Sequence, residues 1–145
     1  MAIKELVRGR VWEFYPKDEA MHMATIKDDA EREEYKQTKS ACFKLRVMGA
    51  EKSAQMSDLG YSGGNIVRLG AVANFACFHS LVGWRNILDK DGKPSKFKGR
   101  EDKSGTCEGA TEEDLDKLAK NIRYEIYTEV TDVTEITEMD FMKSA

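Results

Sequence analysis

The sequence has few of the residues from which catalytic and metal centres are built. It contains two histidines, His22 and His79, and three cysteines, at positions 42, 77 and 107. None of these residues shows the close spacing of a zinc site, and an odd number of separated cysteines argues against the disulfide framework of a secreted protein. Nucleophilic catalysis requires a nucleophile, a base and an orienting group, and the sequence shows no such set. We therefore expect no catalytic residues, no metal and no cofactor.

Two short patterns are similar to ligand-binding motifs but lack the residues that would complete them. Cys77 and His79 are close in sequence, yet residues two apart on a helix point about 200° away from each other. The pattern Asp89-x-Asp91-Gly92 is shared with calcium-binding loops, but the sixth and twelfth positions, which an EF-hand fills with glycine and a carboxylate, hold proline and arginine. We interpret the first pair as core residues and the second pattern as a tight turn.

Long apolar runs and an excess of basic residues are also missing. The most apolar stretch, Ile66–Val82, is interrupted by polar and charged side chains, which indicates a core helix rather than a membrane span. The first residues, Met1–Glu5, lack the apolar segment of a signal peptide. The net charge of −3 gives no overall attraction to nucleic acid, and we interpret the basic side chains of Lys90–Lys103 as a solvated rim. We expect a cytoplasmic protein that contacts neither membrane nor nucleic acid.

The 145 residues suit a single domain, 1–145, of the α+β class. Alternating apolar and polar residues predict strands at Val11–Tyr15 and Ser40–Met48, within a first region, 5–48. The two strands would pair antiparallel, as a hairpin or in a small sheet, on either side of a charged excursion, 17–37. The excursion has too few apolar residues for a wide buried stripe, so we expect a solvated segment with one or two helical turns.

Helices are predicted in the next region, 50–82. Ala50–Leu59 has the pattern of a short helix. The glycine-rich segment Gly60–Asn65 lacks the Gly-Lys-Ser/Thr of a phosphate-binding loop and predicts a hinge, with Asn65 as the N-cap of the next helix. That helix, Ile66–Val82, is apolar on two faces, so we expect it to be central and to pack on the sheet.

The last region, 111–145, is also predicted to be helical. It follows Lys98–Ala110, which has no periodicity and predicts a loop. Thr111 and Asp114 form a capping-box pattern, and Thr134 would cap a last short segment. The first helix of this region would bury one face, made of Leu115, Leu118, Ala119, Ile122, Ile126 and Val130.

The region 83–97, which we call the clasp, leads from the apolar stretch to a turn and then to a single large aromatic residue. Asp91-Gly92 predicts the turn, because glycine accepts positive φ and aspartate bonds to nearby backbone. The turn would fold Phe97 back towards Trp84 and seal the end of the preceding helix. We assign a structural role to six residues: Gly83, Trp84, Asp89, Asp91, Gly92 and Phe97.

The pattern of Gly83-Trp84, an acidic-x-acidic-Gly-Lys turn and a closing Phe97 resembles a signature in small tail-assembly and structural proteins of tailed bacteriophages. Those proteins continue with a helix and end in an acidic last helix, as Leu115–Glu129 and Thr134–Lys143 do here. The resemblance implies a non-enzymatic morphogenesis protein, similar to tail-assembly chaperones, that acts through protein–protein contacts in the host cytoplasm. The implied partner is another phage structural protein, of the tape-measure or tail-tube type.

Two other interpretations stay open. In the first, the protein is a permanent virion component, such as a head–tail connector or neck protein. In the second, it is a phage-encoded regulator that binds a host protein or nucleic acid. For partner contact we expect the strand Ser40–Met48 to offer an edge and the tail Thr131–Ala145 to dock into a groove, with self-association as a second use of these surfaces. The partner-binding candidates of the tail are Ile136, Met139 and Phe141.

Overall fold

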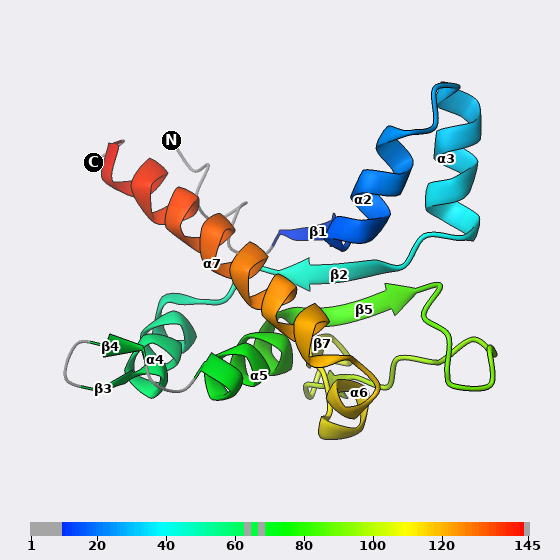
Figure 1. The fold of residues 1–145 in the computed structure, drawn as a ribbon. Helices are drawn as coiled ribbons and strands as arrows, with labels where there is room; N and C mark the ends of the chain where they lie inside the picture. Colours follow the sequence, from blue (N-terminus) through cyan, green and yellow to red (C-terminus); the bar gives the residue numbers. More distant parts are fainter. Residues whose placement is uncertain (1–9, 63–64, 67–68, 144–145) are drawn as a thin grey trace.

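The computed structural model describes residues 10–62, 65–66 and 69–143, and within them the side chains of residues 10–59 and 69–133. The first elements are β1 (Val11–Phe14), α2 (Lys17–Ala24), α3 (Asp29–Thr38), β2 (Cys42–Arg46), α4 (Ala50–Gly60), β3 (Tyr61–Ser62) and β4 (Asn65–Ile66). They are followed by α5 (Leu69–Ser80), β5 (Leu81–Arg85), β6 (Arg100–Glu101), β7 (Cys107–Gly109), α6 (Glu112–Asp116) and α7 (Lys120–Lys143). The fold is α+β, as expected, with a small antiparallel sheet on a central helix and helices at the C-terminal end (Figure 1).

The main sheet is antiparallel and has the strand order β1-β2-β5. Phe14 pairs with Phe43 of β2, and Phe43 pairs with Trp84 of β5. The predicted pairing of the first two strands is thus confirmed, and a third strand is added. Because β2 lies between the other two strands, the expectation that Ser40–Met48 offers an edge is wrong.

The third strand, β5, begins where the sequence predicted the end of a helix. Leu81 and Val82 leave the helix because the chain continues with β-branched and aromatic residues that favour a strand. Gly83 pairs with Lys44 of β2. A continuous apolar run does not reveal by its periodicity where a buried helix passes into a buried strand.

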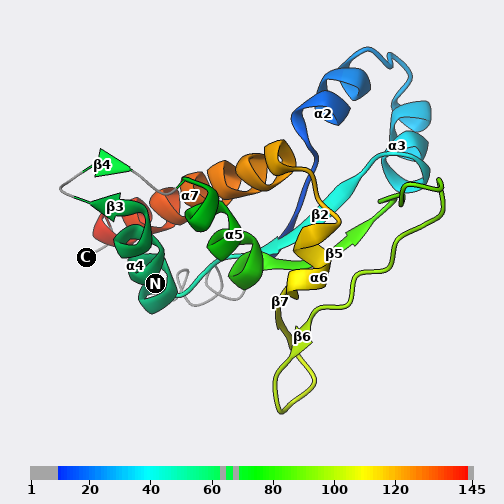
Figure 2. The same ribbon diagram turned by 60° about the horizontal axis from the view of Figure 1, so that its bottom comes forward.

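The sheet has one covered face and one polar face, because successive side chains of a strand alternate between them. Phe43 and Leu45 of β2 belong to the buried core, and Trp12, Phe14 and Trp84 pack beside them. α5 and α7 contribute to the same core, and α7 crosses the sheet on this side (Figures 1 and 2). The opposite face carries the polar cluster described below.

The central helix, α5, packs against both α4 and α7. Its buried side chains include Val72, Ala76 and Cys77, which confirms its central place. It is shorter than predicted, because it begins at Leu69 and ends at Ser80; Asn65, expected as its N-cap, belongs to β4, and the middle of the predicted hinge lies outside the described residues. Neither α5 nor another helix of the described residues is long and apolar enough to cross a membrane.

The segment Lys98–Ala110 contains a hairpin of β6 and β7, where the sequence predicted a loop. The carboxylate of Asp102 closes the hairpin tip by accepting the backbone N–H groups two and four residues ahead, at 2.8 and 3.0 Å. At the base, the N–H of Ala110 donates to the carbonyl of Phe78 at 3.1 Å, and a Cβ at Gly109 would collide with that carbonyl. Strands of two and three residues are too short to show an alternating pattern in sequence.

The predicted capping box is confirmed. The hydroxyl oxygen of Thr111 accepts the N–H of Asp114 at 3.1 Å, and the Asp114 carboxylate accepts the N–H of Thr111 at 2.9 Å. The expectation of a separate segment capped by Thr134 is wrong, because α7 continues through this residue without a glycine or proline to end it. Of the predicted buried face, the structure buries Leu115, Leu118, Ile126 and Val130, half-buries Ile122 and exposes Ala119.

The charged excursion is more helical than predicted. α2 has eight residues and α3 has ten, although neither has a wide apolar stripe. Local interactions support α3: the Asp28 side chain caps its start by accepting the N–H of Ala30 at 3.0 Å, and Arg32 pairs with Asp29 at 2.8 Å. Caps and charge pairs therefore offset the low apolar content.

Trp84 joins the sheet to the clasp. Its indole N–H donates to the carbonyl of Ser95 at 2.8 Å, and its ring meets that of Phe97 edge-on, with 5.0 Å between the centroids. On its other side the ring of Phe43 lies 6.4 Å away. Phe97 thus folds back onto Trp84 as predicted, but Trp84 belongs to the strand β5, and the helix whose end the clasp was expected to seal already ends at Ser80.

We expect Trp84→Ala to lower the free energy of unfolding by roughly 3–5 kcal/mol, because it removes a large aromatic side chain and leaves a cavity. Trp84→Phe keeps most of the packing and deprives the Ser95 carbonyl of its donor, so it should cost about 1 kcal/mol. Urea unfolding followed by circular dichroism measures both changes. An alanine variant as stable as the parent would show that the clasp does not support the fold.

Candidate functional site

The turn of the clasp is closed by Asp89 rather than by Asp91. The Asp89 carboxylate accepts the backbone N–H groups of Asp91 and Lys93 at 2.9 and 3.0 Å, and the Asp89 N–H donates to the Lys93 carbonyl at 2.8 Å. Gly92 has a φ of 79°, the left-handed conformation that was expected of it. The clasp is therefore a short closed loop, and none of its six predicted residues forms a nucleophile–base pair.

The start of the clasp is tied to the end of α3. Asn86 has a φ of 60°, a conformation that asparagine accepts more readily than most residues. Its side-chain amide donates to the carbonyls of Gln37 and Ser40 at 3.2 and 2.9 Å. Arg85 donates to the carbonyl of Lys36 at 3.3 and 3.4 Å. Two consecutive side chains, at the end of β5 and directly after it, thus attach this strand to the last turn of α3 and to Ser40.

Arg85 also organises the polar face of the sheet. Its guanidinium donates to both carboxylate oxygens of Glu13 at 2.9 and 3.1 Å and to the hydroxyl oxygen of Tyr15 at 2.7 Å, and the Tyr15 hydroxyl donates to Glu13 at 2.9 Å. The hydrogen bonds from Arg85 and Tyr15 lower the pKa of Glu13 from 4.5 to about 2. Burial and the bond to Glu13 raise the pKa of Tyr15. Groups with such pKa values exchange protons poorly near neutral pH, so the cluster positions elements and is not suited to acid–base catalysis.

α2 and α3 form a helical hairpin that projects from one end of the sheet, and we call residues 17–38 the arm (Figures 1 and 2). Tyr35 holds its two helices together. The Tyr35 hydroxyl donates to Glu19 at 2.7 Å, and its ring lies 4.8 Å from that of His22. Met23 is the one buried side chain of the arm. The arm is thus an ordered element that contributes little to the core.

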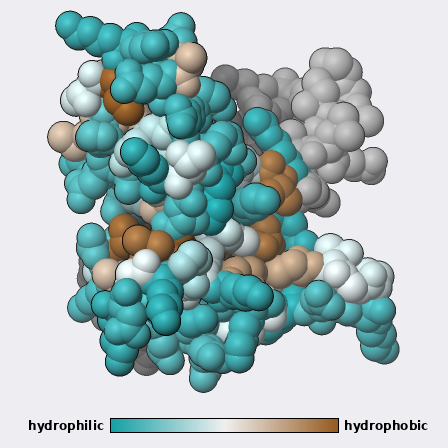
Figure 3. Space-filling view, turned by 90° about the vertical axis from the view of Figure 1, so that its right-hand side faces the viewer, coloured by the Kyte–Doolittle hydropathy of each residue, from teal (hydrophilic) through white to brown (hydrophobic). Residues whose placement is uncertain are grey.

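The hydrogen bonds that the structure describes between arm and body lie at the base of the arm. They are the bonds from Arg85 and Asn86 and one from the N–H of Lys17 to Glu125 at 2.7 Å. Further out the surface is polar: the arm carries seven carboxylates against four basic side chains, and the side chain of Met21 is 61% exposed. Seen from the side of the arm, the molecule is mostly hydrophilic, with small separate apolar patches (Figure 3).

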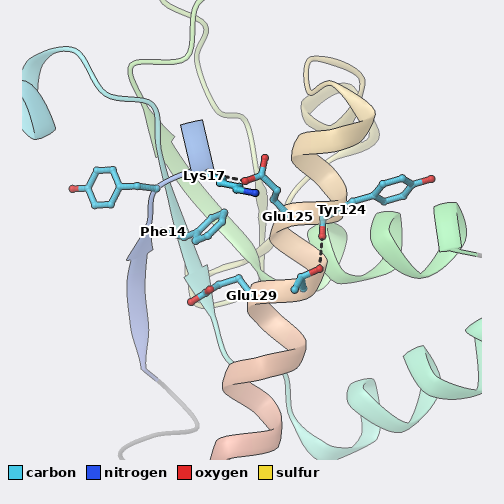
Figure 4. A pocket seen from close by; sticks show the side chains of 7 residues that line it. Phe14, Lys17, Tyr124, Glu125 and Glu129 are labelled. Carbon is cyan, nitrogen blue, oxygen red and sulfur yellow. Dashed lines mark hydrogen bonds between the residues drawn. The ribbon is translucent and has the colours of Figure 1, made fainter. Parts of the chain in front are cut away.

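A groove of about 340 Å³ lies between the base of the arm and α7. Phe14 points from β1 towards α7, Glu129 points from α7 towards this strand, and Glu125 points towards Lys17 at the start of α2 (Figure 4). Glu125 accepts the N–H of Lys17, and Glu129 accepts the indole N–H of Trp12 at 3.3 Å. Because both carboxylates already have donors, the groove is better suited to fix the joint between arm and body than to bind a reactive ligand.

Within the described residues, no group of three His, Cys, Asp or Glu side chains could hold a metal ion. The thiol of Cys77 lies 3.8 Å from the carbonyl of Arg123, and burial raises its pKa to about 12, which disfavours the reactive thiolate. The ring of His79 packs against those of Phe75 and Phe78, with centroid distances of 4.4 and 5.0 Å. Cys77 and His79 thus have separate surroundings, as their spacing predicted.

The predicted partner-binding residues Ile136, Met139 and Phe141 lie on α7 beyond the residues whose side chains the structure describes, so their role stays a prediction. Sequence reasoning missed the links made by Arg85 and Asn86. The one feature of the sequence that could have indicated these links is that Arg85 and Asn86 directly follow Trp84, to which a structural role was assigned. A local pattern does not identify partners that lie about fifty or seventy positions away along the chain.

We compared the chain with protein-family models, with curated proteins and with solved structures. No family model, no curated protein and no solved structure matched it.

Glu13→Gln tests whether the pair with Arg85 stabilises the fold. Because the pKa of Glu13 is lowered from 4.5 to about 2, its contribution is present above pH 4.5 and is lost as the pH falls from 4.5 towards 2. Over this range the parent should lose more stability than the variant, as measured by urea unfolding at several pH values. Glu34→Gln, at an exposed carboxylate of α3, is the matched control. If both variants showed the pH dependence of the parent, the pair would have no stabilising role.

Proposed function

We propose that this protein is a non-enzymatic bacteriophage morphogenesis protein of the tail-assembly chaperone type, and that it acts by binding another structural protein through the arm. The observation that carries the proposal is the projecting α2–α3 hairpin, which is ordered and attached at its base while most of its surface is exposed. The sequence Leu81–Phe97, which includes the clasp, supports the phage assignment by its resemblance to tail-assembly proteins.

The arm is ordered although it buries few side chains, so packing in the core does not explain why the chain keeps it. Fixing each backbone residue costs on the order of 1–2 kcal/mol of conformational entropy, and Met23 is the one arm side chain that is buried. The Asp28 cap of α3 and the Tyr35 contacts keep the arm in shape without a partner. A preformed surface of this kind reduces the ordering cost of association. Protein binding is therefore the use that fits the arm best.

The charge of the arm indicates the chemistry of the partner. With seven carboxylates against four basic side chains, the arm complements a basic surface. A tape-measure or tail-tube protein with such a surface is the partner we propose, and self-association into a homo-oligomer is the competing use of the arm.

Two further assignments remain alternatives to the chaperone role. A permanent virion component, such as a connector or neck protein, would be present in finished particles, whereas a chaperone is absent from them. Mass spectrometry of purified virions separates these two. A regulator that binds nucleic acid would show an affinity that falls steeply with salt.

The first prediction of this proposal concerns the arm. β1 and β2 are antiparallel neighbours, so a short Gly-Ser turn can replace residues 17–39 and leave the sheet intact. We expect the shortened chain to retain a cooperative thermal transition and to lose co-purification with the tape-measure or tail-tube protein of the same phage.

A paired charge variant keeps the test valid if the shortened chain does not fold. Glu33→Gln with Glu34→Gln removes two arm carboxylates and should weaken capture several-fold, by about 1 kcal/mol at an exposed interface. Glu101→Gln with Glu112→Gln removes two exposed carboxylates from the body and should have no effect. Capture unchanged by the arm variant, or equally weakened by both pairs, would exclude the arm as the contact surface.

The second prediction concerns the tail. Ile126 and Val130 of α7 are fully buried, whereas the predicted docking residues lie further along the helix. We expect deletion of Thr134–Ala145 to leave circular dichroism close to that of the parent and to weaken partner capture or self-association. An insoluble truncated chain would assign the segment to the core, and a chain with full capture would exclude it from the interface.

A further inference from the structure

A second recess lies at the opposite end of β2 from the arm, where the strand runs into α4. It has a volume of about 390 Å³ and is lined by side chains from β2, α4, α5, β6 and β7. Arg46 comes from the end of β2, Lys52 from the first turns of α4, and Arg100 from β6. Glu108 is the one acidic residue of the lining, so three cationic side chains face one carboxylate.

Arg100 is fixed in this recess by the protein itself. Its Nε donates to the carbonyl of Ala110 at 2.9 Å, one terminal nitrogen donates to the carbonyl of Phe78 at 2.7 Å, and the guanidinium carbon lies 3.6 Å from the centre of the Phe78 ring. The other terminal nitrogen lies 3.9 Å from the Glu108 carboxylate, too far for a good hydrogen bond. A rigid guanidinium thus retains donor capacity on the side of the recess.

The other two cations, Arg46 and Lys52, line the same recess. Arg46 donates to the backbone carbonyl of Glu108 at 3.3 Å through one nitrogen, which keeps it beside the hairpin and leaves further donors. Gly49 and Lys52 bring the N-terminal end of α4, an eleven-residue helix, to the wall. Helix N-termini attract anions, and the position where Gly49 would carry a Cβ has no atom within 4 Å. The helix end adds to the charge of the side chains.

We propose that this recess is a binding site for a phosphate group, either free or as the monoester end of a small molecule. Among the residues that line the recess, three cations are opposed by one carboxylate, and this excess of positive charge suits a phosphate dianion. Guanidinium groups present paired donors that fit phosphate oxygens. The site goes beyond the arm contact proposed above and does not depend on it.

His79 is a built-in reporter for this site. It lines the recess, and burial, followed by the charges of Lys52 and Arg100, lowers its pKa to about 4. An anion bound beside it offsets those charges and should raise its pKa. The other histidine, His22, lies on the arm and provides an internal control in the same spectrum.

The test is an NMR titration of the full chain with sodium phosphate and, separately, with adenosine monophosphate, against sodium chloride at equal ionic strength. We expect shifts at the amides of Gly49–Lys52 and at the His79 ring, with His22 unchanged. Binding of both ligands assigns the site to the phosphate group, and binding of the monophosphate alone assigns it to an ester. No shift with either ligand, or equal shifts with chloride, would overturn the proposal, as would binding of a single-stranded oligonucleotide without binding of phosphate.

Two charge variants at exposed positions should move the affinity in opposite directions. Lys52→Gln should weaken phosphate binding about three- to tenfold, and Glu108→Gln, which removes the competing carboxylate, should strengthen it about two- to fivefold. Lys90→Gln, in the turn of the clasp, removes one positive charge elsewhere and is the matched control. An equal effect of Lys52→Gln and Lys90→Gln would show that only the overall charge matters and would refute a defined site.

Discussion

The second half of the molecule depends on the hydrogen bonds that the buried carboxylate of Asp114 accepts. The residue is fully buried, and its two oxygens accept the backbone N–H groups of Lys98, Gly99 and Thr111, each at 2.9 Å. Burial alone would raise its pKa, but these hydrogen bonds outweigh burial and lower it. One side chain thus joins the end of the clasp, the start of the β6–β7 hairpin and the first C-terminal helix. The position of Arg100, and hence the wall of the phosphate recess, follows from this junction.

Much of the fold could be predicted wherever a local pattern determines the structure. The alternation in Val11–Tyr15 and Ser40–Met48 identified two strands and their pairing, and Thr111 identified a helix start, because alternation and capping depend on residues a few positions apart. The passage from α5 into β5 at Leu81 could not be predicted, since an apolar run suits both a buried helix and a buried strand. The arm was underestimated for a related reason: its stability comes from caps and contacts between two helices rather than from an apolar stripe.

The candidate sites were harder to predict than the fold. The clasp was visible because Trp84, Gly92 and Phe97 are close in sequence and chemically distinctive. Arg85 and Arg46 look like ordinary surface charges, and their roles arise from partners on distant segments, such as Glu13 for the first and the β6–β7 hairpin for the second. Basic residues that converge from a strand, a helix and a hairpin leave no spacing that a motif could record.

The close approach of Gly109 to the carbonyl of Phe78 has a consequence for how this sequence can diverge. A side chain at residue 109 would have to push the hairpin away from the end of α5, and the N–H of Ala110 would then lose its acceptor. In an alignment of relatives, glycine should therefore be invariant at this position. At the hairpin tip, Gly105 has a φ of 84° and a Cβ at this position would meet no atom within 4 Å, so asparagine or aspartate can replace glycine there and the tip should vary in length. The contrast between these two positions, only four residues apart, would identify distant homologues whose overall sequence identity is low.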